Sequence, residues 1–211
     1  MTLKLHNFFR SSTSTRLRAA LNLKGLEYDY IAYALRKGET RTPEYLAKNP
    51  QGLVPSLELD DGTNPTQSLA IIDYLDHIAP DPALLPSDPV LRAKVQAAAH
   101  TMALDVHPVN NLKVIQHLEA NHGLSKDDSQ NWMRHWMSQG LGAYQALLPN
   151  GNAFSFSDTP QLCDICLVAQ LYNAHRWGVD MTPFARLLEI EEHALKLPAF
   201  DAARPENQPD A

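Results

Sequence analysis

Four prolines lie within ten residues near the middle of the chain, at 80–89, and the sequence differs on the two sides of them. Proline lacks a backbone hydrogen-bond donor and restricts the residue before it, so neither helix nor strand continues easily through such a run. We therefore expect an extended linker at 83–89, between a domain of residues 1–82 and a domain of residues 90–211. A chain of 211 residues is long enough for two small domains.

The part before the linker alternates between short strand patterns and short helix patterns. Strand-forming or alternating residues occupy 3–8, 28–33 and 53–59, and apolar residues recur at helical spacing in 15–24 and 68–78. Strands and helices that alternate over about 80 residues are typical of a mixed-sheet α/β domain.

The part after the linker contains long amphipathic segments and almost no strand pattern. These segments occupy 90–119, 129–148, 160–177 and 183–195. We expect an all-helical second domain, followed by a polar and frayed tail at 204–211.

Charge and hydropathy exclude several classes of protein. The net charge is −6, so the chain has no surplus of cations to replace the counterions of a nucleic acid. The first ten residues lack the apolar run of a signal peptide, and no stretch of about 18 apolar residues predicts a membrane span. We therefore expect that the protein binds no nucleic acid and does not associate with a membrane.

The chain has two cysteines, Cys163 and Cys166, which exclude a disulfide-stapled secreted scaffold and indicate a reducing, cytoplasmic location. Their C-x-x-C spacing lies inside the helical half, whereas a redox pair needs its first thiol at the start of a helix in an α/β unit. We therefore expect buried packing cysteines, and we expect no metal site.

Consecutive hydroxyl residues follow the first strand pattern, and Arg10 precedes them. Ser11, Ser12 and Thr13 begin this run, just before the first helix pattern. Free backbone N–H groups and the positive end of the helix dipole favour an anion there. Helix capping alone also explains serine and threonine at this place, and the spacing does not separate the two interpretations.

Four other positions stand out from their surroundings, and each has a plain structural explanation. Val54-Pro55 begins a strand pattern, and a cis peptide there would turn the Val54 backbone outward, although most X-Pro bonds are trans. Ser68 is predicted as the N-cap of its helix, which makes a second possible anion site. His107 breaks a helical pattern, and Arg176 ends one, where a cation complements the helix dipole.

These motifs together resemble the cytosolic glutathione transferases of the zeta class, which include maleylacetoacetate isomerase and maleylpyruvate isomerase. The resemblance covers essentially the whole chain, through the motifs at 10–25, 49–55, 67–72, 105–112 and 176–183. It implies a thioredoxin-like α/β N-terminal domain that binds glutathione, joined to an all-α C-terminal domain that binds the substrate.

The resemblance also implies roles for single residues. Ser11, Ser12 and Thr13 match the residues that stabilise the thiolate of glutathione. The residues that match the glutathione-binding positions are Gln51, Val54, Gln67, Ser68, His107 and Asn111. Arg10 and Arg176 match the arginines that receive the carboxylates of the substrate.

The activity implied is a glutathione-dependent cis-trans isomerisation of a maleyl keto-acid, a small dicarboxylate. Maleylacetoacetate, which becomes fumarylacetoacetate in aromatic amino-acid catabolism, is the first choice. Maleylpyruvate in the gentisate pathway, α-halo acids and a glutathione-binding stress protein without activity are the alternatives. The family is dimeric, so we expect a homodimer.

The sequence departs from the family pattern at three positions. Thr13 stands where many members carry cysteine, so a thiolate at that position is excluded while a hydroxyl remains. Leu112 follows Asn111, as in the maleylacetoacetate isomerases, whereas the maleylpyruvate isomerases carry arginine. Gln161 replaces the usual serine or threonine three residues before Asp164, and we expect Asp158 or Thr159 to substitute in that helix cap.

Overall fold

The structure is a computed structural model that describes residues 2–211. Contacts within the chain divide the protein into two units. The first unit contains the chain up to residue 83 together with 195–211, and the second contains 84–194. Residues 195–211 therefore belong with the α/β part, whereas sequence analysis places them in the helical domain. The exact limits of the predicted domains remain predictions.

A three-stranded sheet forms the centre of the first unit, with strand order β2–β1–β3. β1 (Leu3–Asn7) pairs in parallel with β2 (Tyr28–Ala32) and antiparallel with β3 (Ser56–Glu58). The three predicted strands are thus confirmed in position, but β3 is shorter than 53–59. It begins only after Pro55, which has no N–H group to donate to a ladder.

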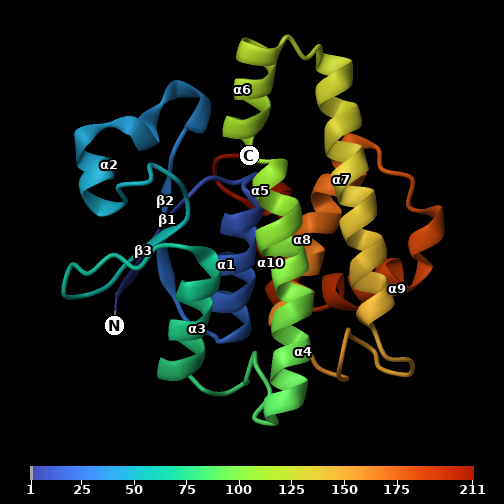
Figure 1. Cartoon of the computed structure of the whole chain (residues 1–211). Helices are drawn as coiled ribbons and strands as arrows, with labels where there is room; N and C mark the ends of the chain where they lie inside the picture. The colour runs from blue at the N-terminus through green and yellow to red at the C-terminus, as the bar shows by residue number, and fades with distance from the viewer. Residues whose placement is uncertain (1) are drawn as a thin grey trace. The chain divides into compact units, whose positions relative to one another are not determined.

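Helices cover both faces of this sheet. α1 (Ser12–Leu23) and α3 (Ser68–Ile78) pack together on one face, and the short α2 (Pro43–Lys48) lies on the other (Figure 1). α10 (Pro198–Ala203) also packs against α1. Short 3₁₀ turns complete the unit at Leu35–Lys37, Glu39–Arg41 and Pro205–Asn207.

A buried lysine ties the end of α1 to the end of α3 and to the start of the proline-rich segment. The Lys24 side chain is fully buried, and its Nζ donates at 2.6 Å each to Asp76 Oδ1, Ala79 O and Pro82 O. All three ammonium donors therefore have partners, as a buried charge requires. The predicted linker at 83–89 is also packed against the protein, because the side chains of Leu84 and Leu85 are buried.

The last residues of the chain are ordered, and the predicted fraying of 204–211 is wrong. Gln208 is buried, and its Nε2 donates to Ala202 O at 2.8 Å and to Arg204 O at 2.7 Å. Asp210 accepts a hydrogen bond from Phe9 N at 3.1 Å. Polar side chains thus fold the segment back on the unit, where the polar composition alone predicts a solvated tail.

A carboxylate on β3 gathers three basic side chains. Glu58 accepts hydrogen bonds from Lys4 Nζ at 2.7 Å and from Lys48 Nζ, and it pairs with His6 Nε2 at 3.3 Å. The hydrogen bond from Lys4, followed by that from Lys48, lowers the pKa of Glu58 to about 2. The ionised form of Glu58 therefore stabilises the folded state.

We expect Glu58→Gln to destabilise the protein in a pH-dependent manner. An unfolded glutamate has a pKa of about 4.3, so the contribution of Glu58 is complete above that pH and is lost as the pH falls toward about 2. Urea unfolding of both proteins between neutral pH and about pH 2 measures the difference in the free energy of unfolding. A difference that stays constant down to the lowest pH would contradict this assignment.

Long helices build the second unit. They are α4 (Pro89–His100), α6 (Leu112–His122), α7 (Lys126–Leu147), α8 (Leu162–Trp177) and α9 (Ala185–Leu195). The all-helical prediction is confirmed. The single predicted segment at 90–119 is interrupted, because α4 passes into a π-helix at Thr101–Val106 and then into the short α5 (His107–Val109).

Gly140 of α7 allows the π-helix to approach closely. A Cβ atom built on Gly140 would lie 2.0 Å from Cγ2 of Val106, whereas one built on Gly142 would meet nothing within 4 Å. Val106 immediately precedes His107, so the fit between Gly140 and Val106 sets the position from which α5 begins.

A buried aspartate caps α8. Asp164 accepts hydrogen bonds from Ser155 N at 2.9 Å and from Gln161 N at 2.8 Å, and burial raises the pKa of its carboxyl group. Asp164 is the third residue of α8 and bonds the N–H group of the N-cap residue Gln161. The expected substitution in this cap by Asp158 or Thr159 is wrong, because Asp158 accepts instead from Ala153 N at 3.0 Å and Thr159 lies beside Ser157. Cys163 and Cys166, beside Asp164, are buried and form no disulfide, as predicted.

Candidate active site

The hydroxyl run lies at the start of α1 and inside its first turn. The helix begins at Ser12 rather than Thr15, with Ser11 as its N-cap, and Ser11 Oγ accepts from Ser14 N at 3.4 Å. Backbone N–H groups of a helix start and several hydroxyls therefore share one place, which favours a bound anion.

A chain of hydrogen bonds joins Ser11 to the loop that precedes β3. Thr13 Oγ1 donates to Val54 O at 2.9 Å, and it lies 2.7 Å from Ser11 Oγ. Because the single proton of Thr13 is used on the carbonyl, Ser11 must be the donor in the second bond. The Ser11 hydroxyl can turn from Thr13 to another acceptor, whereas the Thr13 hydroxyl is committed to the backbone.

The next two hydroxyls of the run serve the fold. Ser14 Oγ accepts from Phe8 N at 3.4 Å, and Thr15 Oγ1 donates to Ser11 O at 3.1 Å. Ser12 is buried, and Arg10 is half-buried with its guanidinium 5.3 Å from the centre of the Phe9 ring. Ser14 and Thr15 are therefore engaged in local structure, whereas the Ser11 hydroxyl can turn to another acceptor.

The loop before β3 is fixed through the carbonyl of Leu53. Tyr45 Oη and Asn49 Nδ2 donate to it at 2.6 and 2.7 Å. The Val54-Pro55 peptide that follows is cis, and Val54 is buried. Rigid anchoring of this kind keeps the Val54 backbone in one orientation.

Gln67 has a strained backbone at the start of α3. Its φ is 70° and its ψ is 113°, the one positive φ found for a residue other than glycine among residues 2–211. Such a conformation is unfavourable for a side chain of this size and occurs mainly at functional sites. Gln67 Nε2 donates to Gln51 Oε1 at 2.8 Å, and both side chains are exposed.

Ser68 is the first residue of α3 and not its N-cap, which corrects the sequence prediction. Gln67 occupies the cap position and makes no side-chain hydrogen bond to the helix. The first N–H groups of α3 therefore lack the usual partner from an N-cap side chain, which leaves them suited to an anion.

In the second unit, His107 and Asn111 lie one helical turn apart. Asn111 Nδ2 lies 3.4 Å from His107 Nε2, while Asn111 Oδ1 accepts from Lys113 N at 3.1 Å and caps α6. Because the Asn111 oxygen is used for capping, its amide group donates to the histidine. The Nε2 atom of His107 accepts in this contact.

Arg176 lies in the last turn of α8 and is exposed. Its guanidinium lies 4.4 Å from the centre of the Trp177 ring. This position fits a cation that complements the helix dipole, and it also presents a guanidinium to solvent beside an aromatic surface.

The first unit thus brings together the hydroxyl run, Val54, Gln51, Gln67 and Ser68, because the segment 49–55 joins the N-terminal regions of α1 and α3. The predicted roles of these residues, and of His107, Asn111, Arg10 and Arg176, remain predictions. Two features have no sequence signal, namely the positive φ of Gln67 and the bond from Thr13 to Val54 O.

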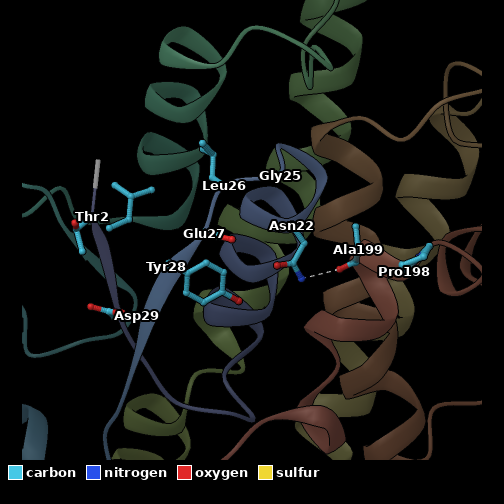
Figure 2. Close-up of a pocket in the computed structure, with 10 residues that line it drawn as sticks. Thr2, Asn22, Gly25, Leu26, Glu27, Tyr28, Asp29, Pro198 and Ala199 are labelled. Carbon is cyan, nitrogen blue, oxygen red and sulfur yellow. Dashed lines mark hydrogen bonds between the residues drawn. The ribbon is translucent and has the colours of Figure 1, made fainter.

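A cavity of about 790 Å³ lies elsewhere in the first unit (Figure 2). It is lined by residues around the end of α1 and the start of β2, among them Gly25 and Tyr28, and Asn22 Nδ2 donates to Ala199 O at its edge at 3.0 Å. The hydroxyl run lies at the opposite end of α1, about 18 Å away for a helix of 12 residues. This cavity is therefore separate from the candidate site.

No helix within residues 2–211 is long and apolar enough to cross a membrane. Across the same described residues, no group of three or more His, Cys, Asp or Glu side chains is placed to hold a metal ion.

Comparison with known proteins gives consistent matches over the chain. The family of glutathione S-transferase N-terminal domains matches residues 10–78. Maleylacetoacetate isomerase of Pseudomonas aeruginosa is 42% identical over 210 residues, which cover 99% of this chain and 98% of that protein.

Two solved structures share the architecture. The holo structure of a maleylpyruvate isomerase, described as a bacterial zeta-class glutathione S-transferase, has a TM-score of 0.96 at 42% identity and covers 99% of both chains. A maleylacetoacetate isomerase of Methylobacterium extorquens AM1, with bound malonate and glutathione, has a TM-score of 0.95 at 34% identity and also covers 99% of both chains.

Proposed function

Since this chain belongs to the zeta-class glutathione transferase family, which includes the maleylacetoacetate and maleylpyruvate isomerases, we propose that it is a glutathione-dependent cis-trans isomerase of a maleyl keto-acid. The observation that carries the proposal is the Ser11 hydroxyl at the N-terminus of α1, held by Thr13 and free to turn to a new acceptor.

The residues of the first unit fit glutathione. The N-terminus of α3, with Ser68 and the strained Gln67, suits the γ-glutamyl carboxylate. The anchored backbone of Val54 suits pairing with the cysteinyl residue, and Gln51 supports Gln67 through their hydrogen bond. His107 and Asn111 are proposed as further polar contacts to the tripeptide.

When bound, glutathione supplies a thiolate that adds reversibly to the alkene, so that rotation takes place about a single bond. The Ser11 hydroxyl and the first N–H groups of α1 stabilise that thiolate by hydrogen bonding to its charged form. Thr13 keeps Ser11 in place, and Ser12 contributes from the same turn. Arg10 and Arg176 receive substrate carboxylates as forked partners.

We expect Arg176→Ala to raise KM for the dicarboxylate by about 10- to 100-fold, with a small change in kcat. A hydrogen bond to a charged group contributes about 1.5–3 kcal/mol, which corresponds to this range. Initial rates at varied substrate concentration and saturating glutathione provide the measurement. An unchanged KM would remove Arg176 from the substrate site.

Maleylacetoacetate is the proposed substrate. Leu112 at the start of α6 supports this choice, because the resemblance implies that maleylpyruvate isomerases carry arginine at the same position. Maleylpyruvate is the second candidate, because a maleylpyruvate isomerase is as similar to this chain as the maleylacetoacetate isomerase is. Conjugation of α-halo acids by the same thiolate is the third.

Initial rates with maleylacetoacetate and with maleylpyruvate, each with and without glutathione, test the proposal. We expect a glutathione-dependent loss of the cis isomer, faster for maleylacetoacetate. A protein that is retained by immobilised glutathione but isomerises neither compound would instead be a binding protein.

We also propose that the enzyme is a cytoplasmic homodimer. The two cysteines form no disulfide, which supports a reducing compartment, and membership of a dimeric family supports the dimer. Light scattering coupled to size-exclusion chromatography measures the mass directly, and a mass near 23.5 kDa would contradict the dimer.

A further inference from the structure

The residue two places before Ser11 is held by charged side chains on both of its backbone groups. Phe9 O accepts from Arg18 Nη2 at 2.8 Å, and Phe9 N donates to Asp210 Oδ2 at 3.1 Å. Hydrogen bonds to charged partners are about twice as strong as neutral ones. The conformation of the loop between β1 and α1 therefore depends on one guanidinium and one carboxylate.

Arg18 is fully buried in the middle of α1, and its donors have partners. Nε and Nη2 donate to Ala203 O at 3.1 and 3.0 Å, and Nη1 donates to Asn7 Oδ1 at 2.9 Å. Burial lowers the pKa of Arg18, and Tyr30, Tyr28 and, least of the three, Asp210 oppose that effect. Asp210 thus has a small electrostatic effect on Arg18 in addition to its hydrogen bond from Phe9 N.

The second oxygen of Asp210 reaches the sheet. Tyr30 of β2 donates its hydroxyl to Asp210 Oδ1. One carboxylate therefore joins β2, the loop before α1 and the last residues of the chain, all within the first unit.

The held loop leads directly to the proposed thiolate donor. Ser11 N donates to Phe8 O at 3.0 Å, and Ser11 then caps α1 and donates its hydroxyl to Thr13. A shift of Phe8 or Phe9 would move Ser11 relative to Val54, to which Thr13 is bonded. Misplacement by about 1 Å is enough to lower a rate by up to about 100-fold.

We propose that Asp210 is a positioning residue that holds the Phe8–Ser11 loop, and through it Ser11, in the geometry that stabilises the glutathione thiolate. This inference rests on the function proposed above, because it assumes that Ser11 faces that thiolate. Asp210 itself needs no contact with glutathione or with the substrate.

Asp210→Ala and Tyr30→Phe test the proposal, with Asp201→Asn as the matched control. Asp201 is a carboxylate of the same C-terminal region, half-exposed and 3.6 Å from Arg204. Tyr30→Phe leaves the carboxylate and removes one of its two anchors. It remains informative if Asp210→Ala fails to fold.

The ultraviolet absorbance of the bound thiolate, followed against pH, gives the pKa of the glutathione thiol in each complex. We expect Asp210→Ala to raise the pKa of the bound glutathione thiol by about one unit. Below that pKa the thiolate fraction then falls about tenfold, and we expect kcat to fall about tenfold with it. Tyr30→Phe should give a smaller change, and Asp201→Asn none. The affinity for S-methylglutathione, which has no thiol to ionise, should stay within about twofold because the contacts of Val54, Gln67 and Ser68 remain.

Hydrogen exchange of the amides at 8–13 is measured in the free proteins. In Asp210→Ala we expect exchange about tenfold faster than in the original protein and in Asp201→Asn, because Phe9 N loses its acceptor. The inference would be overturned if Asp210→Ala left the pKa of the glutathione thiol unchanged. It would also be overturned if the affinity of this variant for S-methylglutathione fell by as large a factor as the thiolate fraction.

Failure of the proposed function gives a different result. If the unsubstituted protein binds glutathione but does not isomerise either substrate, the thiol pKa still decides the role of Asp210. If the unsubstituted protein does not bind glutathione, hydrogen exchange of the amides at 8–13 is the remaining test of the role of Asp210. Faster exchange in Asp210→Ala then supports the holding of the loop, and unchanged exchange overturns it.

Discussion

Replacing Ser11 with alanine is expected to lower kcat for isomerisation by about 10²-fold, because one preorganised donor to a developing or resident anion contributes on that scale. The affinity for S-methylglutathione should change little, since its binding does not require a thiolate donor. Thr13 cannot replace Ser11, because its proton is used on Val54 O. Steady-state rates and calorimetric titration of the two proteins provide the measurement.

Ser11 is also the N-cap of α1, and removal of a cap costs about 1 kcal/mol. Ser11→Gly separates the two roles, because glycine caps a helix almost as well but has no hydroxyl. We expect it to lose as much kcat as the alanine variant while its thermal stability stays close to that of the original protein. Full activity in Ser11→Gly would show that the hydroxyl is not a thiolate donor.

Gly140→Ala is expected to give the largest loss of stability, about 1–3 kcal/mol in the free energy of unfolding, which is the usual cost of overpacking a filled core. The new methyl group would lie 2.0 Å from Val106 Cγ2, and neither the helix nor a β-branched side chain can yield cheaply. Because His107 follows Val106, activity should fall as well. Urea unfolding provides the stability measurement.

Gly142→Ala is the matched control, two residues away on the same helix. A methyl group there meets nothing within 4 Å, so the substitution should stabilise by up to about 1 kcal/mol through helix propensity. The double variant Gly140→Ala with Val106→Ala should recover part of the loss, because it removes the clashing atom. Equal effects of the two glycine substitutions would contradict the close packing of α7 against the π-helix.

Patterns with a regular period predicted the architecture well. The three strands, α3, and the long helices α7 and α8 lie where apolar spacing places them, because burial of one face fixes the period. The interruption at Thr101–Val106 was not predictable, since a π-helix has almost the same composition as an α-helix. The π-helix packs closely against Gly140, where a Cβ atom would clash with Val106, and Gly140 lies far away in the sequence.

Side-chain contacts over long sequence separations account for the other differences. The segment 204–211 is polar, and only the fold reveals that Asp210 meets Phe9 and Tyr30. In the candidate site, helix-capping chemistry located the hydroxyl run. Capping chemistry could not show that Thr13 donates its hydroxyl to Val54 O or that Gln67 has a positive φ, because both depend on the neighbouring loop.

If glutathione acts as a recycled thiol, turnover must require its free thiol and must not consume it. The disappearance of cis-maleylacetoacetate is followed with glutathione or S-methylglutathione while free glutathione is quantified. We expect many turnovers with glutathione, no loss of total glutathione, and no turnover with S-methylglutathione. Turnover with S-methylglutathione, or the consumption of one glutathione for each substrate molecule, would contradict it.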